Sequence, residues 1–327
     1  MNTITRTHVP SRQNTTSQLL WLAWRQHRAT VVWTMTAIGL LGIGMVILSR
    51  MLRSPSTAPG ELEQLTELAN ILLIAQILAP VLIATFWTAP AIAREHEQRT
   101  AVFVWTQDVK PAAWLTVKVA MLGGLTLVAA AWTGVCSAQL ARSIQSVEKS
   151  ASLFESVLFE ASVPIQIGYS LFAFAIGLAA SALLRRTVPA IGLSLGVFIA
   201  ARVVATTSRS EYLPPERLAT PFTGDTGVTR AAPIGENSRR LGVEYADASG
   251  APKPFPWTEC RSAGTREEFQ TCVRGHGVQD VVTVYQPGSR LFLFQVIESS
   301  AFTLAAAALI TWIFLRFRKR STVIGKL

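Results

Sequence analysis

The chain has 327 residues, half of them hydrophobic and only 15% charged, with a formal net charge of +10 at pH 7. Soluble domains carry roughly 25% charged residues, which keep their surface in water, so this composition excludes an ordinary soluble protein and indicates one that buries apolar surface in lipid. The positive charge would suit a nucleic-acid partner, but most of it lies between apolar stretches, where it sets membrane orientation, and no nucleic acid is expected.

Residues 1–28 are predicted to be a cytoplasmic N-terminus that ends in an interfacial helix. Trp21 and Trp24 lie one turn apart, and Arg25 and Arg28 follow them at the start of an apolar stretch. Trp at headgroup depth and Arg at the lipid phosphates are typical of a helix in the membrane interface. The alternative is that this segment extends the first span. The polar part is too long for the start of a signal peptide, so the first apolar stretch is expected to stay in the chain.

Six apolar stretches approach the length of about 20 residues that crosses a membrane. They lie at 29–48, 68–92, 113–140, 163–184, 188–201 and 291–315. The fold class predicted is an all-α integral membrane protein with six transmembrane helices, five within 29–205 and the sixth at 291–315. The fifth stretch is long enough only if residues 202–205 extend it. It carries Gly192, Gly196 and Ala200 on one face, which predicts a close helix contact within the chain or with a second copy.

Lys and Arg are distributed unevenly among the predicted connections. Fifteen lie in the two termini and in the connections on the same side, and four lie in the short connections on the other side. Short cytoplasmic loops are enriched in Lys and Arg. The protein is therefore predicted to be a multi-pass protein of the cell membrane with both termini in the cytoplasm, including a basic tail at 316–327.

Residues 206–290 are the one long polar segment and are predicted to be extracytoplasmic. Many Pro, Gly and Ser residues favour turns, so we expect a small, loop-rich domain with a strand over 278–285. Cys260 and Cys272 are expected to form a disulfide in an oxidising compartment. The alternatives are two free thiols, or a metal site with His276. One His with two widely spaced Cys is a poor ligand set, and no metal is expected.

The chain lacks the motifs of an enzyme. It has no G-x-x-x-x-G-K-[ST] phosphate loop and no G-x-S-x-G turn, and the His-Glu pair at 96–97 lacks the second His of a zinc-binding H-E-x-x-H motif. No catalytic residue and no cofactor is assigned to this chain. If the protein uses ATP, a separate subunit has to bind the ATP and its Mg²⁺.

Two polar residues at membrane depth are candidates for a substrate pathway. A charged side chain at the bilayer centre costs about 3 kcal/mol, and residues with such a cost usually have a function. Glu298 lies near the start of the last span and Gln76 near the middle of the second. Glu298 is either a residue of the outer membrane interface or part of a gate at the outer mouth. Gln76 either lines the same path or is a structural hydrogen-bonding residue between helices.

The connection at 92–114 contains more than a return loop needs. Charged residues cluster at 94–99, an apolar and aromatic run follows at 102–105, and a Pro-containing turn precedes the third span. This pattern predicts a short amphipathic helix that presents a surface to a cytoplasmic partner. The alternative, a solvated face with topology charges, leaves the aromatic residues unexplained. The residues expected to couple to the partner are Arg94, Glu95, Glu97, Arg99, Thr100, Phe103 and Trp105.

These motifs resemble type-2 ABC-transporter permeases. The charged stretch from Glu95 to Thr100, the apolar run at 102–105 and Lys118 at the opening of the next helix are similar to the first cytoplasmic loop of that family. The segment at 21–28 looks like the N-terminus of actinobacterial members, and 286–298 looks like their entry to the last span. Where the commoner family pattern has Gly before the Thr, this chain has Arg99.

The resemblance implies the membrane-spanning subunit of an ATP-driven exporter. Such a permease pairs in the membrane lipid with a second permease copy or homologue, and with ABC ATPase subunits that bind ATP. The helix at 94–105 would dock on the ATPase, and closure of the ATPase pair would switch the spans between inward- and outward-facing states. The competing hypothesis is a membrane-anchored sensor or assembly factor whose extracytoplasmic domain binds a ligand.

Overall fold

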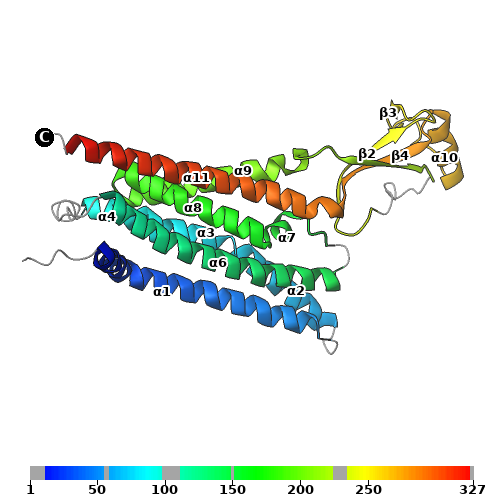
Figure 1. Ribbon diagram of the computed structural model, residues 1–327. Coiled ribbons are helices and arrows are strands. Elements are labelled where there is room, and N and C mark those ends of the chain that lie inside the picture. The colour runs from blue at the N-terminus through cyan, green and yellow to red at the C-terminus, as the bar shows by residue number, and fades with distance from the viewer. Residues whose placement is uncertain (1–11, 55–58, 98–110, 149–150, 224–233, 325–327) are drawn as a thin grey trace, which may run out of the picture.

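The computed structural model describes residues 12–54, 59–97, 111–148, 151–223 and 234–324. It is a long helix bundle with a small sheet domain at one end (Figure 1). Within the described residues, six helical segments are long and apolar enough to cross a membrane: Ser17–Leu52, Gly60–Glu95, Ala112–Val147, Val163–Leu184, Thr187–Glu211 and Gly288–Arg318. The predicted six-span, mainly helical architecture is confirmed, and the chain is a multi-pass membrane protein.

The helices run past the predicted spans at most of their ends. Hydropathy marks only the part of a helix that suits the hydrocarbon core, whereas the helix itself continues through the interface. The bundle helices are α1 (Arg12–Leu52), α2 (Pro59–Ala75), α3 (Leu78–Leu82), α4 (Ala89–Glu97), α6 (Pro111–Val147), α7 (Ser156–Glu160), α8 (Val163–Leu184), α9 (Thr187–Ser208) and α11 (Leu291–Ile324).

The segment predicted to be an interfacial helix is the beginning of α1. Figure 1 shows the first turns of α1, in dark blue, at an angle to the rest of this helix. The Trp21 and Trp24 side chains are 59% and 40% exposed, and the Arg25 guanidinium stacks on the Trp21 ring at 5.2 Å. A helix of 41 residues is about 60 Å long, twice the hydrocarbon thickness. Part of α1 therefore lies outside the lipid core, and its contact with the interface stays a prediction.

The second crossing is broken in the middle. A turn at Gln76 and Ile77 separates α2 from α3, and the π-helix η1 (Ile83–Thr88) joins α3 to α4. The sequence predicts a kink or a helix start at Pro80, and the break lies just before this residue. Pro80 lies just after the turn, where its ring and missing N–H disturb the regular hydrogen-bond ladder. A π-segment inside a helix is rare and is often found at functional sites.

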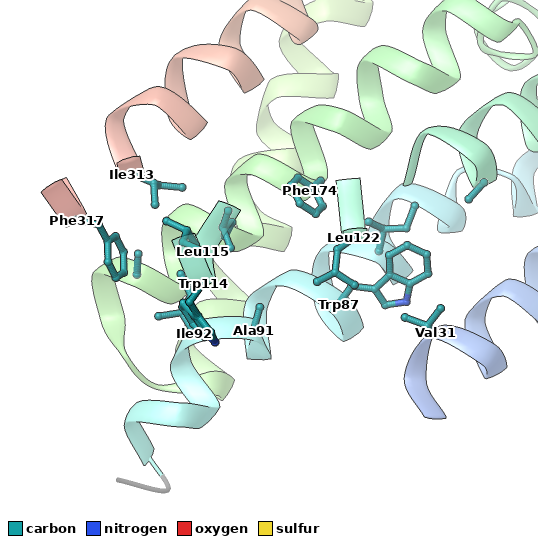
Figure 2. Close-up of a cluster of buried hydrophobic side chains, with 14 of the residues drawn as sticks. Val31, Trp87, Ala91, Ile92, Trp114, Leu115, Leu122, Phe174, Ile313 and Phe317 are labelled. Carbon is teal, nitrogen blue, oxygen red and sulfur yellow. The ribbon is translucent and has the colours of Figure 1, made fainter. Parts of the chain in front are cut away.

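One apolar cluster joins α8 to α1, α3, η1, α4, α6 and α11. Figure 2 shows Val31 of α1, Trp87 of η1, Leu115 of α6, Phe174 of α8 and Ile313 of α11 pointing into this cluster. The Trp87 ring is fully buried, and its indole N–H donates to the hydroxyl of a Thr on α1 at 2.6 Å. Burying a Trp with its polar atom satisfied gives the cluster a large and well-oriented centre.

Two glycines let other elements approach α8 closely. A Cβ at Gly168 would lie 2.9 Å from the Cα of Ser299 on α11, and one at Gly177 would lie 1.9 Å from the hydroxyl oxygen of Thr88 in η1. Real Cβ atoms do not come so near to other heavy atoms. The absence of a side chain at these two positions therefore sets the spacing of α8 from its neighbours.

The sheet domain is more regular than the loop-rich domain that the sequence predicts. It contains strands β1 (Glu216–Pro221), β2 (Arg239–Ala246), β3 (Pro252–Lys253) and β4 (Asp280–Gln286), together with α10 (Arg266–Gly275). The strands are antiparallel in the order β1-β4-β2-β3. The strand predicted at 278–285 is confirmed as the central β4. Pro221 ends β1 and Pro252 lies in edge strand β3, where a missing N–H does little harm to the ladder.

Cys260 and Cys272 form the expected disulfide, which attaches α10 to the segment before it. Both sulfur atoms lie near the His276 ring. Because the disulfide uses both sulfurs, neither is a thiolate that could bind a metal in this state. The bond covers one side of a small core that contains Phe222, Val273 and their apolar neighbours.

The sheet domain is attached to the bundle through the segment that leads into α11. The Gln286 amide donates to the Leu213 carbonyl at 2.7 Å, and Arg290 pairs with Glu216 at 2.8 Å. A Cβ at Gly288 would lie 2.3 Å from the carbonyl oxygen of Glu236. The contacts at the junction between the sheet and the last span therefore explain the residue types in this part of the motif at 286–298.

We predict that Gly168→Ala destabilises the protein, although Ala is normally favoured over Gly inside a helix by about 1 kcal/mol. The new methyl group has to push α11 away, and such overpacking costs about 1–3 kcal/mol. The matched control is Gly192→Ala on α9, because nothing lies within 4 Å of a Cβ there. Thermal unfolding in mild detergent measures both variants. An equal or higher midpoint for Gly168→Ala than for Gly192→Ala would contradict this packing.

Candidate functional site

The predicted coupling segment begins at the end of α4, which lies at the opposite end of the bundle from the sheet domain (Figure 1). Arg94 and Glu97 are exposed at this end and Glu95 is half-buried. The first turns of α1 and α6 and the last turns of α11 lie at the same end. The remaining predicted coupling residues, Arg99, Thr100, Phe103 and Trp105, lie outside the described residues.

A buried ion pair attaches α4 to α6. The Lys118 ammonium lies 2.5 Å from a carboxylate oxygen of Glu95 and donates to the Ala91 carbonyl at 3.2 Å. It also lies 4.2 Å from the centre of the Trp114 ring, and only 3% of Lys118 is exposed. The lysine that opens the third span thus holds the end of α4 by its charge and by a backbone contact.

The last residue of α4 also binds the start of α9. The Glu97 carboxylate accepts hydrogen bonds from the Thr187 backbone N–H and from its hydroxyl, both at 2.8 Å. These bonds hold the pKa of Glu97 below its ordinary value, so the group is charged at neutral pH. A carboxylate at a helix N-terminus also suits the helix dipole.

A third polar contact joins α4 to the central helix α8. The backbone N–H groups of Ile92 and Ala93 donate to the Ser181 hydroxyl at 3.1 and 2.7 Å. The end of α4 is therefore connected by polar bonds to α6, α8 and α9. A displacement of α4 would strain all three contacts.

At the other end of the bundle, Glu298 is buried with only 1% of its surface exposed. Its carboxylate accepts two hydrogen bonds from the Arg209 guanidinium, both at 3.0 Å. The Tyr212 hydroxyl donates to it at 3.1 Å, and the Tyr169 hydroxyl donates to the other oxygen. A bidentate Arg pair with two further donors is the geometry that makes a buried carboxylate tolerable.

A second ion pair extends this cluster. Glu160 of α7 pairs with Arg202 of α9, and a Glu160 oxygen lies 3.9 Å from the Arg209 guanidinium. Arg209 also lies over the Phe159 ring at 3.8 Å. We call the set Glu160, Tyr169, Arg202, Arg209, Tyr212 and Glu298 the buried ion network. The negative charges of its two glutamates balance the positive charges of its two arginines, and the network joins α7, α8, α9 and α11.

The structure brings Glu298 together with residues that the sequence reasoning did not single out. Arg202 was treated as a charge that reaches out of a short fifth span, and Arg209 as part of the polar segment after it. A carboxylate inside a span needs a cation nearby, and both arginines lie near the end of a predicted span. The need for a cation near Glu298 is the feature of the sequence that could have indicated Arg202 and Arg209.

Gln76 lies at the break between α2 and α3 and is fully buried. Within the described part of the chain, neither its amide nitrogen nor its amide oxygen has a hydrogen-bond partner. None of the hydrogen bonds between described residues joins it to Glu298. The two pathway candidates are therefore separate polar points, and their place in a substrate path stays a prediction.

One known protein family is similar to this chain. Residues 53–209 match the family model described as ABC-2 membrane transporter related. Over these residues the chain is similar to that family. The resemblance to type-2 ABC permeases is thereby confirmed, and the match supports a membrane subunit of a transporter. Neither the curated proteins nor the solved structures that were compared gave a match to this chain.

The matched region covers the helices from α2 to α9 and both ends of the bundle. It includes the end of α4, Lys118 and the contact with Thr187 at one end, and Glu160, Arg202 and Arg209 at the other. The partner of Arg209, Glu298, comes from α11 outside the matched region. The last span is thus bound to the matched region by a buried ion pair.

We predict that Glu298→Ala lowers the free energy of unfolding by about 3–5 kcal/mol, because it leaves the Arg209 charge buried without its main partner. Replacing both residues, Glu298→Leu with Arg209→Met, is expected to recover part of the loss. The control is Glu244→Ala in the exposed pair with Arg217, whose side chains are 45% and 66% exposed, and its effect should be small. Unfolding in denaturing detergent measures each variant. A loss in Glu298→Ala no larger than in Glu244→Ala would show that the network is not a main support.

Proposed function

We propose that this protein is the membrane-spanning permease subunit of an ATP-driven ABC exporter in the cell membrane. The observation that carries the proposal is the ABC-2 match over residues 53–209 in a chain whose sequence has no phosphate loop of its own. ATP and Mg²⁺ bind to a separate ABC ATPase subunit, and this chain supplies the path across the membrane. The chain itself is not an enzyme in this proposal.

The ATPase docks at the end of α4 and on the residues that follow it. Arg94 and Glu97 are exposed there, and the aromatic residues Phe103 and Trp105 supply the apolar part of the surface. Support comes from the polar contacts of α4 with α6, α8 and α9, which would carry a push on α4 into three spans. Rigid-body movement of packed helices is a common way to switch a transporter between two states.

The termini and the docking surface face the cytoplasm, and the sheet domain faces outward. The excess of Lys and Arg at the end that holds α4 supports this orientation. The disulfide in the sheet domain supports it as well, because disulfides persist in oxidising compartments.

A second permease copy or a homologue pairs with this chain in the membrane lipid. On α9, nothing described lies within 4 Å of a Cβ built at Gly192 or Gly196. The close helix contact that these small residues predict is therefore not made by the described part of this chain. A neighbouring permease is the partner that the family resemblance offers for this face.

The sensor or assembly-factor hypothesis is supported by the sheet domain, which has its own small core. It gives no account of the ABC-2 match, which lies wholly in the span region. The exporter is therefore the function that we put forward.

We predict that Phe103→Asp and Trp105→Asp leave the protein inserted in the membrane but weaken its association with the ATPase. A charge in an apolar docking surface has to be desolvated, which costs several kcal/mol when it is unpaired. The measurement is the amount of phosphate-loop ATPase that co-purifies in mild detergent. The control is Trp257→Asp, an exposed position in the sheet domain, which should retain the ATPase. Equal retention in all three variants would remove the docking surface from the account.

Orientation is tested by labelling intact cells with a membrane-impermeant maleimide. Cys260 and Cys272 are expected to react only after a mild impermeant reductant has opened the disulfide. A cysteine introduced by Ser321→Cys in the basic tail is expected to react only after the membrane is permeabilised. Labelling of the tail from outside would reverse the proposed orientation.

A further inference from the structure

A polar cavity of about 260 Å³ lies between α1 and α4, at the end of the bundle away from the sheet domain. Its polar lining comes from Gln26 and His27 of α1, Arg94 and Glu95 of α4, and Lys118 of α6. The residues come from three helices that meet only in the folded bundle. The cavity is therefore a product of the tertiary structure.

The lining favours an anion. Two cations, Arg94 and Lys118, face one carboxylate, Glu95, and Lys118 already binds that carboxylate. None of the ion pairs between described residues includes Arg94. The His27 side chain is only 8% exposed, and its Nε2 atom has no hydrogen-bond partner within the described residues. A phosphate or carboxylate group would find one uncompensated guanidinium and a buried ring nitrogen there, and charge-assisted bonds to Arg are the strong ones.

A second, apolar cavity continues from the first along α1. It has a volume of about 340 Å³ and is lined by Thr30, Trp33 and Ala37 of α1 and by Leu82 and Phe86 of the second crossing. Thr30 and Phe86 line both cavities, so the polar and apolar spaces adjoin. Trp33 is 77% exposed and lies within an apolar span, which means that this groove opens toward the acyl chains of the membrane.

The dimensions fit one leaflet of a bilayer. The lining residues of α1 run from Gln26 to Ala37 over both cavities, which is about 16 Å at the rise of an α-helix. The apolar groove alone runs from Ala29 to Ala37, about 12 Å, which lies within the half-thickness of about 15 Å of the hydrocarbon core. The polar cavity lies at the headgroup end of this half.

We propose that the two cavities form one binding site for a bilayer phospholipid with an anionic headgroup. The phosphate lies between Arg94, Lys118 and His27, and one acyl chain lies in the groove between Trp33, Ala37 and Phe86. A water-soluble anion would leave the groove empty, and an uncharged lipid would leave Arg94 without a partner. An anionic amphiphile is the chemical class that fills both parts. The site does not depend on the proposed exporter function.

The bound lipid bridges the start of α1, with its exposed Trp rings, to the end of α4. The described residues of these two segments make few direct contacts with each other. Because a ligand that binds only the folded state stabilises it, anionic lipid is expected to raise the thermal midpoint of the purified protein. Zwitterionic lipid is expected to have a smaller effect.

The test uses the full-length purified protein and phosphatidylglycerol that carries a photoactivatable diazirine in one acyl chain. Cross-linked peptides are expected within residues 29–37 and 82–94. Arg94→Glu reverses the charge in the polar cavity, and Ala37→Trp fills the groove. Arg94→Glu is expected to reduce cross-linking by about tenfold or more, because it removes a charge-assisted contact. Ala37→Trp is expected to reduce it by a similar factor, because the new ring occupies the space of the acyl chain.

Matched controls lie on α11, outside both cavities. Arg316→Glu changes the same charge at the same end of the bundle, and Ala308→Trp adds the same ring at an exposed position. Both are expected to cross-link like the wild type. The thermal midpoint of every variant is recorded, so that loss of folding is not taken for loss of binding.

Two experiments on the unaltered protein keep the proposal testable without any variant. Phosphatidylcholine has the same phosphate, but its own choline cation offsets the negative charge and adds a like charge beside Arg94 and Lys118. With the same diazirine chain it is therefore expected to cross-link at this site much less than phosphatidylglycerol, and inorganic phosphate is expected not to compete. Equal labelling by the two lipids would overturn the anionic site. Competition by inorganic phosphate would overturn the part played by the groove. Wild-type labelling in folded Arg94→Glu and Ala37→Trp would overturn the proposal as a whole.

Discussion

The pairing of Glu298 with Arg209 is the interaction on which the half of the bundle next to the sheet domain depends. A carboxylate this deep among apolar helices is stable only if a cation and further donors replace water, and Arg209, Tyr169 and Tyr212 supply them. Glu298 belongs to α11, and its partners come from α8 and from the residues that follow α9. Neither α11 nor the residues after α9 can move alone without leaving a buried charge unpaired.

The same residues connect the spans to the sheet domain. Tyr212 binds Glu298, and the next residue, Leu213, accepts a hydrogen bond from Gln286 at the end of β4. A change in the angle between α9 and α11 would therefore reach the sheet within a few residues. At the opposite end, α4 is connected to α6, α8 and α9 through Lys118, Ser181 and Thr187. Helices α8 and α9 take part at both ends, which gives the proposed exporter a continuous physical link between its input end and its outer end.

Features that depend on local composition could be predicted from the sequence. Long apolar runs predict spans, because a helix in lipid has to satisfy its own backbone and cover its surface with apolar atoms. The β-branched residues of 278–285 predict β4, and two cysteines in an otherwise polar segment predict the disulfide. The predicted order of spans also puts the sheet domain and the end of α4 at opposite ends of the bundle, as Figure 1 shows. Which end faces the cytoplasm stays a prediction from the distribution of Lys and Arg.

Features that depend on distant residues could not be predicted in this way. Arg209 and Glu298 are far apart in the chain, and the sequence indicates that Glu298 needs a cation without indicating which one. Pro80 is a local signal for the break near Gln76, but the π-helix η1 lies where the second crossing packs on α8, and the contact of Thr88 with Gly177 joins residues far apart in the chain. Strands β1 to β3 contain Pro, Gly or charged residues that are locally typical of loops. They are strands because β4 pairs with β1 on one side and with β2 on the other, and β2 in turn pairs with β3.

The most direct test of the proposed function is site-specific photo-cross-linking in living cells. A photoreactive amino acid replaces Glu97 at the exposed end of α4, and another replaces Glu259 at an exposed position in the sheet domain. The proposed function predicts a covalent adduct between position 97 and a phosphate-loop ATPase, and none from position 259. An ATPase adduct from position 259, or none from position 97 while the protein is folded in the membrane, would contradict it.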